Sequence, residues 1–174
     1  MSDTPPDQDT AAPAANQPVL APLNIVGQYI KDMSFEVPGA PDIFNALRQQ
    51  SPAIQVALDA NVRQITGPLF EVVMNVQLEA KVGDKVAFIM ELVYGTLAEL
   101  NPQAVPEEHA HPVLLIEVPR LMFPFVRHIV STTIATAGFP PVMLQIVDFA
   151  DMYRKKFAEQ GSPDAPADTT PAVH

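Results

Sequence analysis

The stretch that decides the fold reads Gln28-Tyr-Ile-Lys-Asp-Met-Ser-Phe-Glu-Val-Pro-Gly-Ala-Pro41. From Tyr29 to Val37 it alternates with period two, which predicts a β-strand because successive side chains of a strand point to opposite faces of a sheet. The Pro- and Gly-rich run after Val37 ends the strand. One predicted face is apolar, with Tyr29, Met33, Phe35, Val37 and the stem of Lys31; the other has Ile30, Asp32, Ser34 and Glu36. From spacing alone, these two carboxylates belong to a solvated outer face.

Three further segments predict strands. Ile54, Val56 and Leu58 alternate with polar or small residues, and the alternation from 72 to 81 is nearly strict. A Gly83-Asp84 turn then leads into a strand over 86–94. The segment 42–52 has no clean period and is expected to be a crossover loop. Successive strands with one polar face predict an antiparallel sheet that is covered on one side.

The C-terminal half predicts two helices. Segment 95–112 has three prolines and is expected to be a long loop. A helix follows from about Glu117 to Ala137, with Pro119 in its first turn and Pro124 bending it. The last helix begins at Asp148, a good N-cap residue. The predicted fold class is α+β, a four-stranded antiparallel sheet with two C-terminal helices.

The long helix is apolar around much of its circumference, which indicates burial on more than one side. Its apolar or small positions are Leu121, Phe125, Val126, Ile129, Val130, Thr133, Ile134 and Ala137. One sheet covers only one side. Either the last helix or another subunit covers the second side, and we favour the subunit.

Composition separates a core from two tails. Residues 1–22 hold five prolines and three aspartates, and 160–174 hold three prolines and two aspartates. Both are expected to be disordered because they bury too little apolar surface to offset the entropy of ordering. The core, 23–159, holds all ten Lys and Arg and fifteen of the twenty acids. This acidic balance disfavours binding to nucleic acid or anionic membranes and suits a basic partner or simple solubility.

Composition also bears on compartment and chemistry. The chain has no cysteine, and its start lacks the basic and apolar runs of a signal peptide. Charges interrupt the apolar segment 113–137, so we expect no membrane insertion and a cytoplasmic location. No nucleophile elbow, catalytic triad or phosphate loop is visible, so we expect no enzyme and no cofactor.

One cluster, Glu107-Glu-His-Ala-His111, has a metal-like composition. His-x-His with flanking carboxylates could bind zinc weakly, but no recognised spacing supplies a third or fourth ligand. We therefore interpret it as an exposed loop and expect no metal site.

Several motifs occur in the order that is typical of one family. They are Tyr29-x-Lys-Asp-x-Ser-Phe-Glu-x-Pro-x-x-Pro41, Phe70–Val73 with Gly83–Glu91, Leu121-Met-Phe-Pro-Phe-Val-Arg127, and Gly138–Pro141 with Val147–Phe149. From about Asn24 to Phe157 the chain resembles SecB, the bacterial protein-export chaperone. The resemblance implies a homotetramer, a dimer of dimers with the long helices between the dimers.

The resemblance also implies a groove for unfolded protein chains, here called clients. Ile54, Val56 and Leu58 correspond to the family's client-contact strand, and Phe44 on the crossover is a further candidate. Well-studied members carry a Trp in the crossover, whereas this chain has no Trp and has Gln and Ser within 48–51. That end of the groove is therefore expected to be less aromatic.

A second surface follows from the same resemblance. In the family, the outer face of the sheet binds the basic, zinc-bearing C-terminal segment of the SecA motor ATPase. The matching positions are Asp32, Glu36, Ile89 and Glu91, and any zinc belongs to SecA. The implied function is ATP-independent binding of unfolded secretory precursors and their delivery to SecA. The alternative is a SecB-like chaperone dedicated to a toxin–antitoxin pair, against which the retained Asp32, Glu36 and Glu91 argue.

Overall fold

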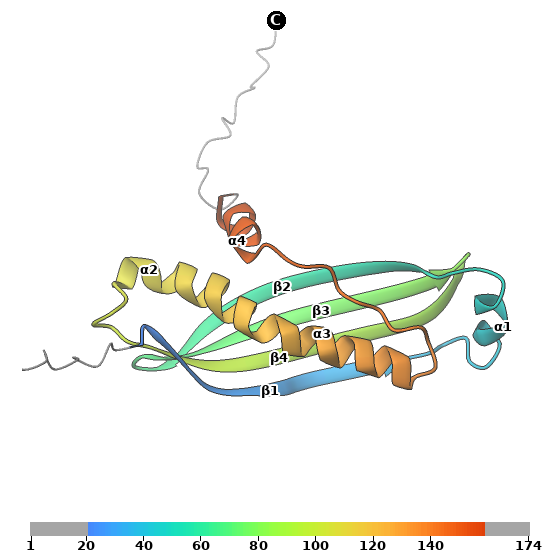
Figure 1. Ribbon diagram of the computed structural model, residues 1–174, viewed down its shortest axis with the longest axis horizontal. Coiled ribbons are helices and arrows are strands. Elements are labelled where there is room, and N and C mark those ends of the chain that lie inside the picture. The colour runs from blue at the N-terminus through green and yellow to red at the C-terminus, as the bar shows by residue number, and fades with distance from the viewer. Residues whose placement is uncertain (1–20, 159–174) are drawn as a thin grey trace, which may run out of the picture.

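The structure, a computed structural model, describes residues 21–158 as a long antiparallel sheet with helices packed against it (Figure 1). The strands are β1 (Leu23–Glu36), β2 (Ala53–Thr66), β3 (Leu69–Val82) and β4 (Lys85–Leu100), in the spatial order β1-β4-β3-β2. The helices are α1 (Ile43–Leu47), α2 (Glu107–Pro112), the π-helical segment η1 (Val113–Glu117), α3 (Val118–Thr136) and α4 (Phe149–Ala158). The predicted α+β class with a four-stranded antiparallel sheet is confirmed. The predicted tails lie outside the described residues, except for Ala21 and Pro22.

Two glycine turns connect the three strands β2, β3 and β4. Val82 pairs with Lys85, which confirms the predicted Gly83-Asp84 turn, and Gly83 has a φ of 59°. Gly67, with a φ of 50°, turns β2 into β3. Both values lie in the left-handed region that glycine adopts without steric cost.

A β-bulge in β1 breaks the alternation that the sequence predicts. The register of β1 on β4 shifts between Ile30 and Asp32, so that Lys31 is the extra residue. Because a bulge adds one residue to the strand, the side chains before it point to the opposite faces from those that an unbroken alternation with the residues after it would predict. Tyr29 and Lys31 therefore lie on the face of Asp32, and Ile30 lies on the face of Met33. Their predicted faces were wrong because the alternation of residue types does not reveal a bulge.

Two strands are longer than the sequence predicts. β2 continues to Thr66, and β4 continues to Leu100 through residues that were predicted to begin a loop. Residues 95–99 pair with both β1 and β3, Leu100 pairs with β1, and the even-numbered side chains of this segment are buried. The loop prediction was wrong there because pairing on both sides outweighs the weak strand preference of Gly95 and Glu99.

The long helix also begins earlier than predicted. Helical structure begins at Glu107, directly after Pro106, and continues through η1 into α3. Pro112 and Pro119 flank η1, where the π-helical hydrogen bonding already departs from the α-helical pattern. α3 runs through Pro124 as one helix. The predicted loop up to 112 was wrong because its prolines occupy helix-compatible positions.

The crossover after β1 is likewise not a plain loop. It contains α1, and the Ile43 side chain at the start of α1 is buried in the core. The predicted start of the last helix is confirmed: the backbone N–H of Asp151 donates to Asp148 Oδ1 at 3.0 Å.

α3 covers the sheet with a single buried stripe. Met122, Val126 and Val130 recur every fourth residue and are fully buried against the core. Leu121 and Phe125 point away and are 50% and 52% exposed, so α4 does not cover the second side of α3. The interpretation that the last helix covers that side is therefore wrong.

Candidate functional site

The three β2 residues predicted to contact clients lie on the helix-covered face of the sheet, at its edge. Ile54, Val56 and Leu58 each pair with a buried apolar residue of β3. Val56 is nevertheless 48% exposed, because β2 is an edge strand and α3 lies over the middle of the sheet (Figure 1). These residues, the β2 tract, form an apolar strip that is open to solvent.

Phe44 belongs to an aromatic cluster near one end of the sheet. Its ring lies 5.1 Å from the ring of Phe139, which in turn contacts Phe88 and Phe35. Gly138, with a φ of 90°, brings the chain after α3 close to Phe44. Phe44 is partly buried, so it supports this end of the surface more than it offers a free contact.

Sequence reasoning missed two exposed apolar residues on the connection between α3 and α4. Met143 is 54% exposed and Ile146 is 87% exposed, whereas Leu144 between them is buried. The segment returns over the sheet from the end of α3 to α4 (Figure 1). Its sequence has no helical or strand period, so only the buried Leu144 fixes which neighbours point outward.

α4 is attached to β2 directly after the β2 tract. Lys156 Nζ donates to Asp59 Oδ1 at 2.6 Å, to the Ala60 carbonyl at 2.9 Å and to Asn61 Oδ1 at 3.0 Å. At its start, Phe149 packs on Phe123 of α3 with ring centroids 5.6 Å apart. α4 thus bounds the β2 tract at Asp59.

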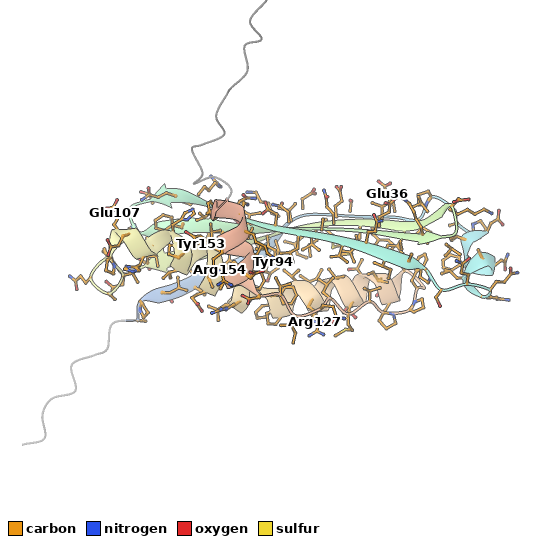
Figure 2. The ribbon with its side chains drawn as sticks, turned by 90° about the horizontal axis from the view of Figure 1, so that it is seen from above. Glu36, Tyr94, Glu107, Arg127, Tyr153 and Arg154 are labelled. Carbon is orange, nitrogen blue, oxygen red and sulfur yellow. The ribbon has the colours of Figure 1, made fainter. Side chains whose placement is uncertain are left out.

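The opposite face of the sheet carries the residues predicted to bind SecA. Ser34 pairs with Glu91 and Glu36 with Ile89, so Asp32, Glu36, Ile89 and Glu91 lie on neighbouring strands β1 and β4 with the same orientation. Figure 2 shows Glu36 on the far side of the sheet from α3. The structure therefore brings these four residues, the acidic face, together as predicted.

β3 extends the acidic face in a way that the sequence motifs do not reveal. Glu79 pairs with Ile89, and Gln77 Nε2 lies 3.5 Å from Glu91 Oε1. Lys81 forms an ion pair with Glu79 at 3.0 Å. The period-two pattern of β3 already placed Gln77 and Glu79 on the outer face, but their neighbours follow only from the register.

Further along the same face lies a buried carboxylate that sequence reasoning also missed. Glu71 is 1% exposed, and it accepts hydrogen bonds from the Tyr29 hydroxyl, from Arg63 Nε and from Lys31 Nζ, the last at 3.0 and 3.1 Å. The Tyr29 hydrogen bond, followed by those from Arg63 and Lys31, lowers the pKa of Glu71 to about 2. The same bond raises the pKa of Tyr29. This Glu71 cluster joins the edge strands β1 and β2 through β3.

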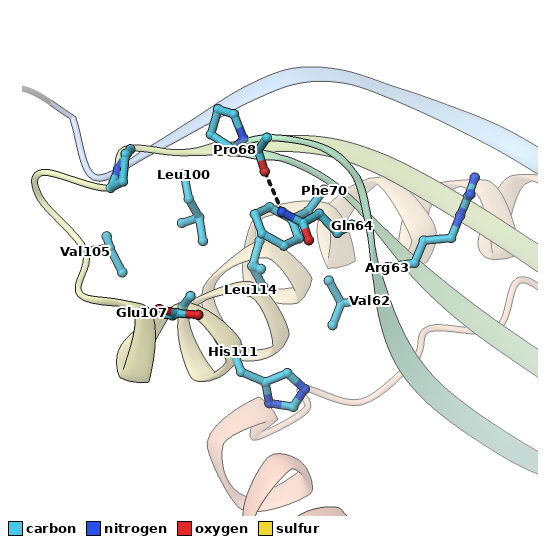
Figure 3. Close-up of a pocket in the computed structure, with 13 residues that line it drawn as sticks. Val62, Arg63, Gln64, Pro68, Phe70, Leu100, Val105, Glu107, His111 and Leu114 are labelled. Atoms are coloured by element: carbon cyan, nitrogen blue, oxygen red, sulfur yellow. Dashed lines mark hydrogen bonds between the residues drawn. The ribbon is translucent and has the colours of Figure 1, made fainter.

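A separate cavity of about 790 Å³ opens at the end of the sheet that carries the β2–β3 turn (Figure 3). Val62, Phe70, Leu100 and Leu114 supply apolar walls, and His111 lies at the α4 side. No sequence pattern indicated this cavity, because its walls come from β2, β3, β4 and the helical segment after β4. It is distinct from the β2 tract, which ends where α4 meets β2.

The His-x-His cluster lies on α2 instead of in a loop. His111 Nδ1 is 3.0 Å from the Tyr153 hydroxyl, and its ring packs edge-on against Phe157 of α4. Across residues 21–158 no group of three or more His, Cys, Asp or Glu side chains is placed to hold a metal ion. Within the same residues, no helix combines the length and apolar character needed to cross a membrane.

Comparison with known proteins identifies the family. The model of the family described as preprotein translocase subunit SecB matches residues 14–160. The chain is similar to the protein-export protein SecB of Rhodospirillum rubrum, with 49% identity over 85% of this chain and 88% of the relative. It is also similar to the protein-export protein SecB of Paramagnetospirillum magneticum, with 44% identity over 82% of this chain and 90% of the relative.

A solved structure shares the fold. It is the Mycobacterium tuberculosis Rv1957 SecB-like chaperone in complex with a ChAD peptide from the Rv1956 HigA1 antitoxin. The TM-score is 0.61 at 16% identity, over 72% of this chain and 90% of the other. This structure shows a shared fold, whereas the family model and the sequence identities establish the family. The chain belongs to the SecB family of protein-export chaperones.

Proposed function

We propose that this chaperone binds unfolded secretory precursors along the β2 tract, without ATP or catalysis, and delivers them to SecA through the acidic face. One observation carries the proposal: the two surfaces lie on opposite faces of one sheet. Ile54, Val56 and Leu58 are on the helix-covered side, and Glu36 and Glu91 are on the other. A client and a motor can therefore bind at the same time.

The chemistry of each surface suits its partner. Unfolded precursors share exposed apolar side chains, and an open apolar strip binds them through many shallow contacts. Met143 and Ile146 lie on the segment that leads to α4, and we assign them to the same client surface as Val56. The acidic face suits the basic segment of SecA, because complementary charge speeds association and fixes orientation.

We further propose that the chain assembles as a homotetramer, a dimer of dimers, with α3 at the contact between dimers. Leu121 and Phe125 leave an apolar patch on α3 without a partner among residues 21–158. Arg127 Nε is buried and has no hydrogen-bond acceptor within those residues, and Figure 2 shows Arg127 on the side of α3 away from the sheet. A second subunit would supply both an apolar surface and an acceptor.

The toxin–antitoxin alternative finds less support. The likeness to the mycobacterial chaperone concerns the fold alone, and it says nothing about what this chain binds. Asp32, Glu36 and Glu91 lie together on one face, and this grouping of carboxylates supports docking of the basic segment of SecA.

Two sets of variants test the proposal. Val56→Asp with Leu58→Asp should abolish suppression of aggregation of an unfolded secretory precursor, measured by light scattering, and leave SecA binding intact. Asp32→Asn, Glu36→Gln and Glu91→Gln together should weaken SecA binding, measured by calorimetry, and leave precursor binding intact. Equal loss of both activities in either set contradicts two separate surfaces.

Matched controls isolate each surface. Ile65→Asp changes an exposed apolar residue of β2 outside the tract and should leave precursor binding unchanged. Asp42→Asn, Glu107→Gln and Glu108→Gln together remove the same charge at the start of α1 and on α2, away from the acidic face, and should leave SecA binding unchanged. If this control triple weakens SecA binding as strongly, net charge and not the acidic face is responsible.

A further inference from the structure

The Glu71 cluster contains the cation that is nearest in sequence to the acidic face. Lys31 directly precedes Asp32 and, as the bulge residue of β1, projects its side chain onto the same face of the sheet. An unrestrained lysine at this position would lie among the carboxylates of the acidic face and compete with a basic partner for them.

The observed contacts keep this cation away from the acidic face. Lys31 Nζ lies 3.0 Å from Glu71 Oε1, and Glu71 is 1% exposed. The pairing places Asp32 beside Val93 and Asn75, whereas Glu71 is four residues further along β3 than Asn75. At about 3.3 Å per residue, the Glu71 backbone lies roughly 13 Å along the sheet from the Asp32 row, so the ion pair draws the Lys31 side chain along the sheet, away from that row.

We infer that Glu71 is a positioning residue for docking: it holds Lys31 away from Asp32 and Glu91, so that the acidic face presents uncompensated negative charge to a basic partner. The inference rests on the proposed docking of SecA to that face. It assigns Glu71 no contact with SecA.

Arg63 provides an internal comparison. It contacts the same carboxylate through Nε, but it lies on β2 and pairs with Glu71, in the row of Leu97. Leu97 is six residues from Glu91 along β4, or roughly 20 Å at 3.3 Å per residue. Releasing Arg63 from Glu71 therefore leaves the charge at the acidic face nearly unchanged. Releasing Lys31 from Glu71 places a cation among the carboxylates of that face.

The test uses the full chain and SecA, with affinity measured by calorimetry at low ionic strength. Glu71→Gln keeps an acceptor for the Tyr29 hydroxyl but removes the charge that holds Lys31. We expect it to weaken SecA binding about two- to five-fold, the effect of one added exposed ion pair. Precursor binding and subunit number should match the unmodified chain.

Rescue separates positioning from a merely structural role. Lys31→Met in the Glu71→Gln background should restore SecA affinity, because the competing cation is gone, and Arg63→Met in that background should not. Loss of affinity that Lys31→Met does not restore overturns the inference, as does unchanged affinity in Glu71→Gln. If the unmodified chain itself does not bind SecA, the proposed docking is wrong instead.

Discussion

The ring of Tyr29 lies directly over Gly95, so close that a Cβ atom at position 95 would be 2.7 Å from Tyr29 Cζ. Tyr29 is on β1 and its hydroxyl reaches Glu71 on β3, so the ring has to cross β4. Glycine at this position of β4 leaves the space for that crossing.

Gly95→Ala should therefore destabilise the fold. The added methyl group displaces the Tyr29 ring and breaks its hydrogen bond to Glu71, at a cost of about 1–3 kcal/mol, typical of overpacking. Urea unfolding at pH 7 measures the change. Gly27→Ala is the matched control, because a Cβ there meets no atom within 4 Å. Equal stability of the two variants would show that the Tyr29 ring moves aside freely.

The pH dependence of stability should report on Glu71. Its pKa is lowered from 4.5 to about 2, so its contribution is complete above pH 4.5 and is lost as the pH falls toward 2. At 1.36 kcal/mol per pKa unit, the contribution is at most about 3 kcal/mol. The difference in unfolding free energy between the unmodified chain and Glu71→Gln should shrink between pH 5 and pH 3. Parallel pH profiles would contradict the burial of an ionised Glu71.

The attachment of α4 to β2 depends on one lysine. Lys156→Met removes three hydrogen bonds to the segment Asp59–Asn61 and should loosen the C-terminal half of α4. Amide hydrogen exchange in α4 should accelerate several-fold, whereas the core strand β3 stays protected. Lys155→Met is the control, since Lys155 pairs within α4 with Asp151. Equal acceleration in both variants would show that Lys156 does not anchor the helix.

The sequence predicts what is local and periodic. Strict alternation placed Glu91 and Ile89 on the outer face, and the register confirms this because β4 has no bulge over 88–100. The same logic failed at Tyr29, where a bulge reverses the pattern. The partners of Glu71 are side chains of the two edge strands, with Tyr29 and Lys31 reaching across β4 and Arg63 coming from the neighbouring β2, and no local pattern contains these contacts.

The client surface likewise contains one residue that a periodic pattern predicts and two that no pattern predicts. The period-two alternation of β2 predicts the direction of the Val56 side chain, and the exposure of that side chain follows from the edge position of β2. Met143 and Ile146 lie in a segment without a period, and only the burial of Leu144 in the folded chain turns them outward. Sequence reasoning alone could not have separated them from ordinary loop residues.

The exposed side of α3 should govern assembly. Leu121→Asp with Phe125→Asp places two charges on a helix surface that we propose is buried between dimers, where an unpaired charge is strongly unfavourable. Native mass spectrometry should show the tetramer of 18.9 kDa chains falling to dimers.

Met143→Asp with Ile146→Asp is the matched control for that variant, because it changes two apolar residues that are at least as exposed as Leu121 and Phe125 and that we assign to client binding. This pair should leave the tetramer intact and reduce suppression of precursor aggregation. A tetramer that survives the α3 substitutions would place the subunit contact elsewhere. Dissociation by the control pair would mean that the connection between α3 and α4, and not the exposed side of α3, forms the interface.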